Sequence, residues 1–351
     1  MVFKILKPID FHAIISLLEN IHPASKMRLL AFARTSNQGY IKHLSSPHRR
    51  QIMFDRRTFA KVALASTNAI IAKNYSLAID PVKRTGKPLI KLSLAAYSFR
   101  KYLDFKGANK PTMTLEQFAE YASEQGLGAI EPTSYYFPDT SREFFPKYKA
   151  FCSKLGLDIS GSAVGNNFCI PDATKLKEQM TSVNDWIERC SVLGCKTIRI
   201  FAGTVAKGDT EEKAKERCIN AIGQACDHAA KFGVILALEN HGGITASADQ
   251  ILGLVKSINH PFFGVNLDTG NFHTADPYGD LARLAPYAVT VQIKTEIQKQ
   301  GQKKEDADLR KLVEILKNVN YRGYMALEYE ANEDPKTGVP KAIEELKKLV
   351  V

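Results

Sequence analysis

Residues 234–243 read VILALENHGG, an apolar run of β-forming residues that ends on Glu239, Asn240 and His241 before two glycines. A buried strand has no structural need for three such polar residues at its tip. In parallel α/β folds, however, functional side chains gather at the carboxyl ends of the strands. The stretch therefore predicts a buried parallel strand that carries functional groups at its end.

Similar apolar runs recur from residue 89 onward, and amphipathic helical windows separate them. The other seven runs are 90–96, 128–133, 157–163, 197–203, 263–268, 289–294 and 324–330. Helical windows lie at 114–126, 211–233 and 308–319, and the first opens on a Thr cap and closes on Gly. Eight buried strands that alternate with helices predict an α/β fold, the (β/α)8 TIM barrel. The alternative is an open doubly wound sheet, which the lack of a Gly-x-Gly-x-x-Gly turn after the first strand disfavours.

The last four predicted strands carry polar side chains at or near their carboxyl ends. These are Glu239 on the fifth, Asp268 on the sixth, Gln292 on the seventh and Glu328 on the eighth. Consecutive strands of a barrel are neighbours, so the four groups are expected to converge, and three carboxylates in one pocket repel one another. A divalent cation relieves that repulsion. Oxygen donors favour Mn²⁺ or Mg²⁺, with Co²⁺ or Zn²⁺ as alternatives.

Further polar groups are expected around the same mouth. Lys294 lies two residues beyond Gln292 and so shares its face of the strand; it is a candidate acid, base or oxyanion partner. The alternative for Lys294 is a salt bridge to Glu296 or to a ligand carboxylate. His241 is a candidate proton shuttle or hydrogen-bond donor to substrate, with a loop-packing histidine as the alternative.

A hydroxyl-rich ligand needs several hydrogen-bonding groups and an aromatic face. Tyr97 after the first strand, Glu131 on the second, Arg199 on the fourth and Asn271 after the sixth are candidate substrate-binding residues. For Arg199 the alternative is a structural charge that balances the acids. The sequence has no obvious cradle for a phosphate group, which favours an unphosphorylated ligand.

The formal net charge of +11 comes from the first part of the chain. Residues 1–90 contain 15 Lys and Arg against 4 Asp and Glu, and the remainder contains 33 of each sign. A neutral barrel is unsuited to bind a phosphate backbone, so we expect no nucleic-acid partner.

Residues 53–72 read MFDRRTFAKVALASTNAIIA and resemble a bacterial twin-arginine export signal, with Arg56, Arg57, Phe59 and Lys61 in the motif positions. The apolar run is shorter than the roughly 20 residues that span a membrane. An amphipathic helix with a chance Arg pair is the alternative. The signal predicts a periplasmic or secreted protein without a stable membrane anchor.

These features predict four parts of the chain. They are an upstream extension (1–52, poorly ordered, with Met53 as the expected start), the signal (53–78), a linker (79–88) and the barrel (89–351). A barrel of this kind is typically about 250 residues long.

The strand-end residues resemble those of the xylose isomerase-like barrel superfamily, in its sugar phosphate isomerase/epimerase branch. This branch includes ketose 3-epimerases, hydroxypyruvate isomerase and inosose dehydratase, and the resemblance covers about residues 89–351. Its pattern of Glu, Asp, His or Gln, and Glu implies that Glu239, Asp268, Gln292 and Glu328 bind one divalent metal. Gln at the third position is more similar to inosose dehydratase, and Asn271 stands where the ketose epimerases have His.

The resemblance also implies a mechanism. In ketose epimerases the metal stabilises an enediolate, and the two glutamates, here Glu239 and Glu328, move the proton. We therefore expect an isomerase or epimerase acting on an unphosphorylated sugar or keto-sugar. The alternative is a lyase or dehydratase of the inosose or 3-keto-glycoside type, because both classes use the same metal-binding residues.

Two other classes share this fold or site. Endonuclease IV needs several more metal-binding histidines than His241 and His273 at these strand ends. A non-catalytic sugar-binding protein would have no need to keep both Glu239 and Glu328. The expected partner is a small sugar or polyol. The helical faces would allow a homodimer, but no stripe of residues in the sequence indicates one.

Overall fold

The structure is a computed structural model, and it describes residues 79–104 and 110–350. The main-sheet strands are β1 (Leu89–Ala95), β2 (Ala129–Glu131), β3 (Asp158–Ile159), β4 (Ser162–Ala163), β5 (Thr197–Ile200), β6 (Ile235–Glu239), β7 (Phe263–Asp268), β8 (Ala288–Ile293) and β11 (Arg322–Leu327). A separate antiparallel pair is β9 (Glu296–Ile297) with β10 (Glu305–Asp306). The predicted parts 1–52 and 53–78 lie outside the described residues.

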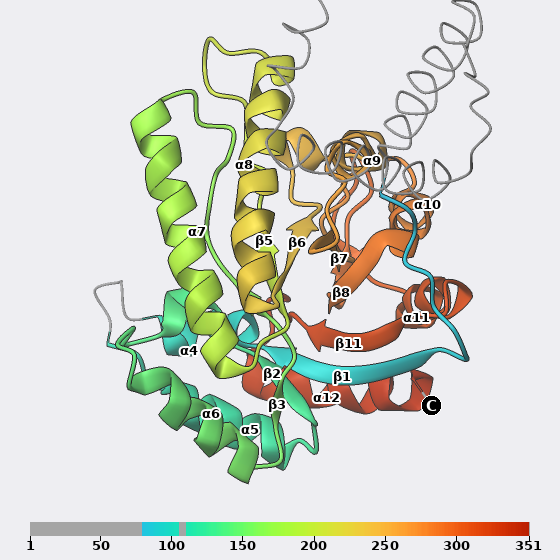
Figure 1. The fold of residues 1–351 in the computed structure, drawn as a ribbon. Coiled ribbons are helices and arrows are strands. Elements are labelled where there is room, and N and C mark those ends of the chain that lie inside the picture. The colour runs from blue at the N-terminus through green and yellow to red at the C-terminus, as the bar shows by residue number, and fades with distance from the viewer. Residues whose placement is uncertain (1–78, 105–109, 351) are drawn as a thin grey trace, which may run out of the picture. The chain divides into compact units, whose positions relative to one another are not determined.

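The helices alternate with these strands along the chain (Figure 1). They are α4 (Arg100–Leu103), α5 (Leu115–Glu124), α6 (Phe144–Lys154), α7 (Ala173–Leu193), α8 (Glu211–Phe232), α9 (Ala248–Ser257), α10 (Pro277–Leu284), α11 (Leu309–Asn318) and α12 (Pro335–Leu349). Short 3-10 turns are η1 (Ala96–Phe99), η2 (Ser134–Tyr136), η3 (Gly243–Thr245) and η4 (Ala285–Tyr287).

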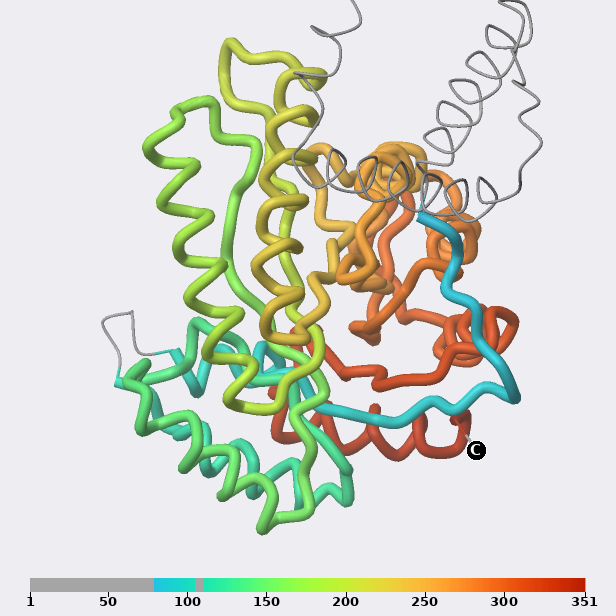
Figure 2. Tube along the Cα trace, in the orientation of Figure 1, coloured from blue at the N-terminus to red at the C-terminus, as the bar shows by residue number. Residues whose placement is uncertain are grey.

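The main sheet curls into a barrel. Its strand order is β3-β2-β1-β11-β8-β7-β6-β5-β4, and every neighbouring pair is parallel. Figure 2 shows β1 running beside β11, so the first and last strands of the main sheet in chain order are neighbours. The predicted (β/α)8 barrel is therefore confirmed.

One predicted strand, 157–163, differs from a regular barrel strand because it is split in two. Its first half, β3, pairs with β2, and its second half, β4, pairs with β5. A single bridge between Thr133 and Ala163 links the two edges of the sheet. The break includes Gly161, where an added Cβ would lie 3.0 Å from Thr197 Oγ1 and 3.1 Å from Glu131 Oε2. An added side chain would therefore press against both of these groups.

The predicted helix signals act as helix ends in the structure. Thr114 and Gln117 form a capping box that begins α5. Thr210 caps α8, which ends at Gly233 with a left-handed φ of 68°. These ends place the helices outside the sheet, where their apolar faces pack on the barrel (Figure 1).

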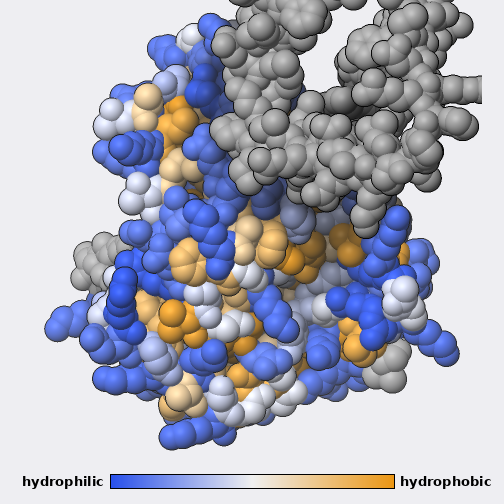
Figure 3. Space-filling model, in the orientation of Figure 1, coloured by the Kyte–Doolittle hydropathy of each residue, from blue (hydrophilic) through white to orange (hydrophobic). Residues whose placement is uncertain are grey.

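The core is apolar and aromatic. Near α6 and α7 the rings of Phe137, Phe145 and Trp186 pack with centroids 5.0–5.9 Å apart. All six cysteines are buried with free thiols. On the face in Figure 3 hydrophilic side chains dominate and apolar ones are interspersed. The packed apolar and aromatic core holds the strands rigid, which favours precise placement of side chains at their ends.

The segment 79–88 contacts the amino-terminal end of the barrel. The Val82 amide donates to the Pro286 carbonyl at 2.9 Å. The Arg84 guanidinium lies 5.3 Å from the Tyr321 ring centroid and donates to the Ala288 carbonyl. The segment predicted as a linker is thus attached to the barrel along part of its length. Among the described residues, no helix is both long and apolar enough to cross a membrane.

Candidate metal centre and active site

A cavity of about 240 Å³ opens at the carboxyl ends of the strands. Its walls come from residues on or after β1, β2, β5, β6, β8 and β11, which are Tyr97, Tyr135, Arg199, Phe201, Glu239, His241, Lys294, Glu328 and Glu330. Six of these nine are residues that the sequence predicts for the site. Strands that lie next to one another in the sheet therefore bring together side chains up to 233 positions apart in sequence (Tyr97 to Glu330).

Three carboxyls at the strand ends are almost fully buried. Glu239, Asp268 and Glu328 are 3%, 0% and 6% exposed. Burial is the largest cause that raises the pKa of each carboxyl to about 7, because water no longer stabilises the charged form. Such a set ionises fully only when positive charge lies among the carboxyls.

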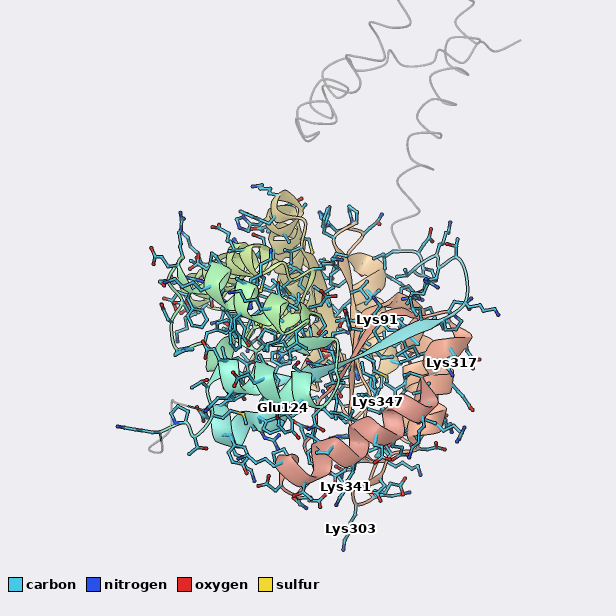
Figure 4. All side chains as sticks on the ribbon, turned by 90° about the horizontal axis from the view of Figure 1, so that it is seen from below. Lys91, Glu124, Lys303, Lys317, Lys341 and Lys347 are labelled. Carbon is cyan, nitrogen blue, oxygen red and sulfur yellow. The ribbon has the colours of Figure 1, made fainter. Side chains whose placement is uncertain are left out.

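Lys294 supplies part of that charge. Its Nζ lies 3.2 Å from Asp268 Oδ2, 3.2 Å from Glu328 Oε2 and 2.9 Å from Glu330 Oε2. Burial favours the neutral amine, but the surrounding carboxylates, Asp268 first among them, together outweigh it and raise the pKa of Lys294 well above its usual value. Lys294 is therefore a buried ammonium group. By contrast, Lys303 and Lys341 extend into solvent (Figure 4).

A second cation, Arg199, lies beside Glu239. Arg199 Nε is 2.8 Å from Glu239 Oε2, and its guanidinium lies 3.9 Å from the Phe201 ring centroid. Arg199 Nη1 also donates to the Val164 carbonyl at 3.2 Å. This pairing is the charge-balancing role that the sequence leaves open for Arg199.

Asn271 links the two cationic halves of the site. Its Nδ2 donates to Glu239 Oε1 at 2.8 Å, and its Oδ1 accepts from Lys294 Nζ at 3.1 Å. Asn271 thus orients two of the predicted functional groups. Its predicted contact with substrate stays a prediction.

Gln292 and Glu131 lie together beneath the cavity. Gln292 Nε2 donates to Glu131 Oε1 at 2.7 Å, and Gln292 Oε1 accepts from Asn266 Nδ2 at 2.7 Å. Burial raises the pKa of Glu131 to about 7. The described residues that line this cavity do not include Glu131, which the sequence predicts to bind substrate. The side-chain amide of Gln292 thus bonds to Glu131 and Asn266. The buried carboxyls of Glu239, Asp268 and Glu328, in contrast, contact Lys294 or Arg199.

His241 and Tyr97 line the cavity, as expected for substrate contacts. The His241 ring packs on Phe201 with centroids 4.5 Å apart. Loss of water around the ring, followed by the positive charge of Arg199 and Lys294, lowers the pKa of His241. The imidazole is therefore neutral at pH 7 and able to accept a proton.

The third polar residue of the opening stretch has a structural role. Asn240 Nδ2 donates to the Asp268 carbonyl, and Asn240 Oδ1 accepts from the Asp268 amide, both at 2.9 Å. This double hydrogen bond ties the end of β6 to the end of β7. It fixes the spacing between Glu239 and Asp268.

Three wall residues were not predicted. Glu330 follows Glu328 by two positions and so shares its direction, a period-2 signal that the stretch ALEYE at 326–330 contains. Phe201 and Tyr135 carried no comparable signal, because a single aromatic residue after a strand is equally typical of the core.

The fit of a divalent ion can be tested on these contacts. Asp268 Oδ2 is buried and has no hydrogen-bond partner, only the ion pair to Lys294. Carboxylate oxygens suit hard ions. In residues 79–104 and 110–350, however, no three His, Cys, Asp or Glu side chains are arranged to hold a metal as they stand. The donor chemistry fits an ion, and the ammonium of Lys294 lies between two of the expected ligands.

The comparisons with known proteins agree with the barrel. The structure is similar to D-psicose 3-epimerase from Clostridium cellulolyticum H10 crystallised with D-tagatose (TM-score 0.61, 15% identity, 74% of this chain and 99% of that one). It is also similar to the IOLI protein with a bound zinc atom (0.59, 20%, 74% and 96%). A third is the probable 3-DHS dehydratase AsbF from Bacillus anthracis (0.57, 15%, 73% and 98%).

At these identities the solved structures share the fold with this chain. No curated protein sequence matches the chain. A family model described as xylose isomerase-like TIM barrel matches residues 119–349, which is most of the described barrel. The chain therefore belongs to the xylose isomerase-like TIM barrel family.

Proposed function

We propose that this protein is a divalent-metal-dependent sugar isomerase or epimerase that moves a proton at a carbon beside a carbonyl group. The observation that carries the proposal is the pair Glu239 and Glu328. Both line one cavity, both are buried, and they come from β6 and β11, which β7 and β8 separate in the sheet. Two carboxyls in one pocket can serve a substrate from different sides.

The charges in the cavity favour an unphosphorylated sugar or keto-sugar. The two cationic wall residues, Arg199 and Lys294, are each paired with carboxylates. A phosphate group would have to compete with those carboxylates for the same cations. Hydroxyl groups, in contrast, can bond to Tyr97 and His241 without breaking an ion pair.

The proton chemistry follows from the surroundings of each group. A general base works best when its pKa is near the working pH, and burial raises the pKa of Glu328 to about 7. Neutral His241 is placed to relay a proton at the cavity wall. Glu239, Asp268 and Glu328 would hold the ion. Gln292 would join them after its side-chain amide rotates. A bound divalent ion would act as a Lewis acid toward the substrate carbonyl.

Deuterium exchange tests this proposal directly. The protein, loaded with Mn²⁺ or Mg²⁺ in deuterated water, would be incubated with keto-sugars and inososes. NMR would show deuterium at the carbon beside the carbonyl, even where net turnover is slow; with Mn²⁺ the ion is removed by chelation before spectra are recorded. Absence of exchange across the panel, in protein with its metal in place, would exclude proton abstraction from these substrates.

Metal content gives the first prediction. We expect Asp268→Asn to bind the ion at least about tenfold more weakly, since even a neighbour that only orients a metal ligand contributes 10- to 100-fold. Asn keeps the oxygen that accepts from the Gly270 amide at 2.8 Å, so the barrel should still fold. Glu239→Gln should also lower metal content. Elemental analysis of purified protein measures both, and wild-type content in both variants would refute the site.

A lyase is the second candidate, and the cavities beside the site favour it. The central cavity shares Tyr135 with one of about 300 Å³ and shares Lys294 and Glu330 with one of about 170 Å³. Together they leave room for a substrate with a leaving group beside its sugar ring. The comparison with the probable dehydratase AsbF is consistent with this class.

Product analysis separates the two candidates. Elimination leaves an unsaturated or deoxy-keto product that absorbs ultraviolet light, whereas epimerisation leaves the number of C=O and C–O bonds unchanged. A rise in absorbance with inososes or 3-keto-glycosides would establish the lyase. Epimeric sugars without that rise would establish the epimerase.

We also propose that the chain is exported by the twin-arginine route. Its support is the motif around Arg56 and Arg57, which lies outside the described residues. We expect the double substitution Arg56→Lys with Arg57→Lys to abolish export, because recognition of a twin-arginine signal depends on the arginine pair. Periplasmic yield in a bacterial host, with and without residues 1–52, measures the effect. An unchanged yield from the double variant would contradict the assignment.

A further inference from the structure

The position of Lys294 is the feature that the proposed chemistry leaves unexplained. Its ammonium lies at equal distances of 3.2 Å from Asp268 Oδ2 and Glu328 Oε2, two of the expected metal ligands. Both oxygens belong to buried carboxyls, where an unpaired charge is costly. The ammonium therefore supplies, within the chain itself, part of the positive charge that an ion would bring.

The surroundings of Lys294 allow its side chain to move while its backbone stays fixed. The Lys294 amide donates to Thr269 Oγ1 at 2.9 Å, which holds the strand end. The stem passes over Gly270, where an added Cβ would lie 2.6 Å from Lys294 Cδ. A lysine side chain has a flexible four-carbon stem and a compact charge, so a small rotation relocates the ammonium.

Glu330 is the third carboxylate that contacts the ammonium, and it can keep that contact when the other two are lost. Its carboxylate is 2.9 Å from Lys294 Nζ and its side chain is 25% exposed, whereas Asp268 is fully buried. Glu330 and Lys294 both line the adjacent cavity of about 170 Å³. The ammonium can therefore withdraw into that cavity and keep one ion pair.

We infer that Lys294 is a place-holder for the metal. Either its ammonium or the divalent ion binds the carboxylates of Asp268 and Glu328, but not both at once, and the ammonium stays with Glu330 when the ion enters. This inference rests on the proposed metal centre. It explains how a pocket with three buried carboxyls stays folded without an ion. It also means that an ion binds only by displacing an internal cation.

The test is the affinity for Mn²⁺, measured by calorimetry on metal-free protein, together with the thermal midpoint of that protein. Lys294→Met should bind Mn²⁺ at least about tenfold more tightly, because no ammonium competes. Its metal-free form should melt at a lower temperature than wild type. Lys348→Met is the matched control: Lys348 lies 3.2 Å from Glu344, is 70% exposed, and should change neither quantity.

Glu330→Gln separates displacement from a general effect of charge. It should weaken Mn²⁺ binding in the wild-type background, because the displaced ammonium loses its second partner. In the Lys294→Met background the same change should have little effect. An equal loss in both backgrounds would overturn the inference, since charges that act independently give additive changes.

A further variant keeps the test valid if Lys294→Met fails to fold. Gly270→Ala places a methyl group against the lysine stem while the charge remains. It should also tighten Mn²⁺ binding by moving the ammonium off the carboxylates. Should wild type bind Mn²⁺ while neither Lys294→Met nor Gly270→Ala binds it more tightly, the place-holder is refuted and the metal centre stands. If wild type and both variants bind no ion, the metal centre itself is refuted, and the inference with it.

Discussion

Glu328→Gln is expected to lower turnover per bound metal ion by about 10²–10⁴-fold. The amide oxygen of glutamine can still bind an ion, but glutamine cannot accept a proton. Glu328 lines the cavity, is 6% exposed, and has a pKa that burial raises to about 7. These are the properties of a base that works near neutral pH.

The measurement is turnover, or deuterium exchange, on an identified substrate, with metal content determined on the same sample. His241→Ala serves as the comparison, because a proton relay should matter less than the base itself. If Glu328→Gln retains its metal and turns over substrate at close to the wild-type rate, proton transfer by Glu328 is excluded.

The barrel could be predicted because its signals are local. An apolar run such as 234–240 followed by a capped helix needs no knowledge of distant residues. The split of the run 157–163 was not predictable in this way. It is defined by pairing across the sheet, since β3 pairs with β2 and β4 with β5, and such pairing exists only in the closed barrel.

The site likewise has features that could be predicted from the sequence and features that could not. The convergence of Glu239, Asp268 and Glu328 follows from the order of strands in a barrel, and the structure does place them close to the same two cations. Which cation each carboxyl contacts does not follow from strand order. Arg199 pairs with Glu239, and Lys294 with Asp268 and Glu328, because of side-chain lengths and directions that sequence periodicity does not encode.

Gln292 illustrates the limit most clearly. Strand periodicity places its side chain inside the barrel, and the structure agrees. Its amide bonds, however, to Glu131 on β2 and Asn266 on β7. A neutral amide can donate and accept at once, so its orientation depends on which neighbours present a matching group.

Arg199→Met is expected to lower the free energy of unfolding by about 3–5 kcal/mol, the cost of removing one partner of a buried ion pair. Both partners are buried, and Arg199 also closes a hydrogen bond to the Val164 carbonyl. Without the guanidinium, Glu239 keeps only the Asn271 amide as a close partner for its carboxylate among the described residues. Urea unfolding of the metal-free protein measures the change.

Arg283→Met is the matched control for this effect. Arg283 pairs with Asp249 on the surface, where the two side chains are 48% and 83% exposed and water screens the charges, so its loss should cost far less than the loss of Arg199. Adding Glu239→Gln to Arg199→Met should recover much of the stability, because no buried charge is then left unpaired. Equal costs for Arg199→Met and Arg283→Met would show that water reaches Glu239. A water-exposed Glu239 would not have the raised pKa on which its proposed part in proton transfer depends.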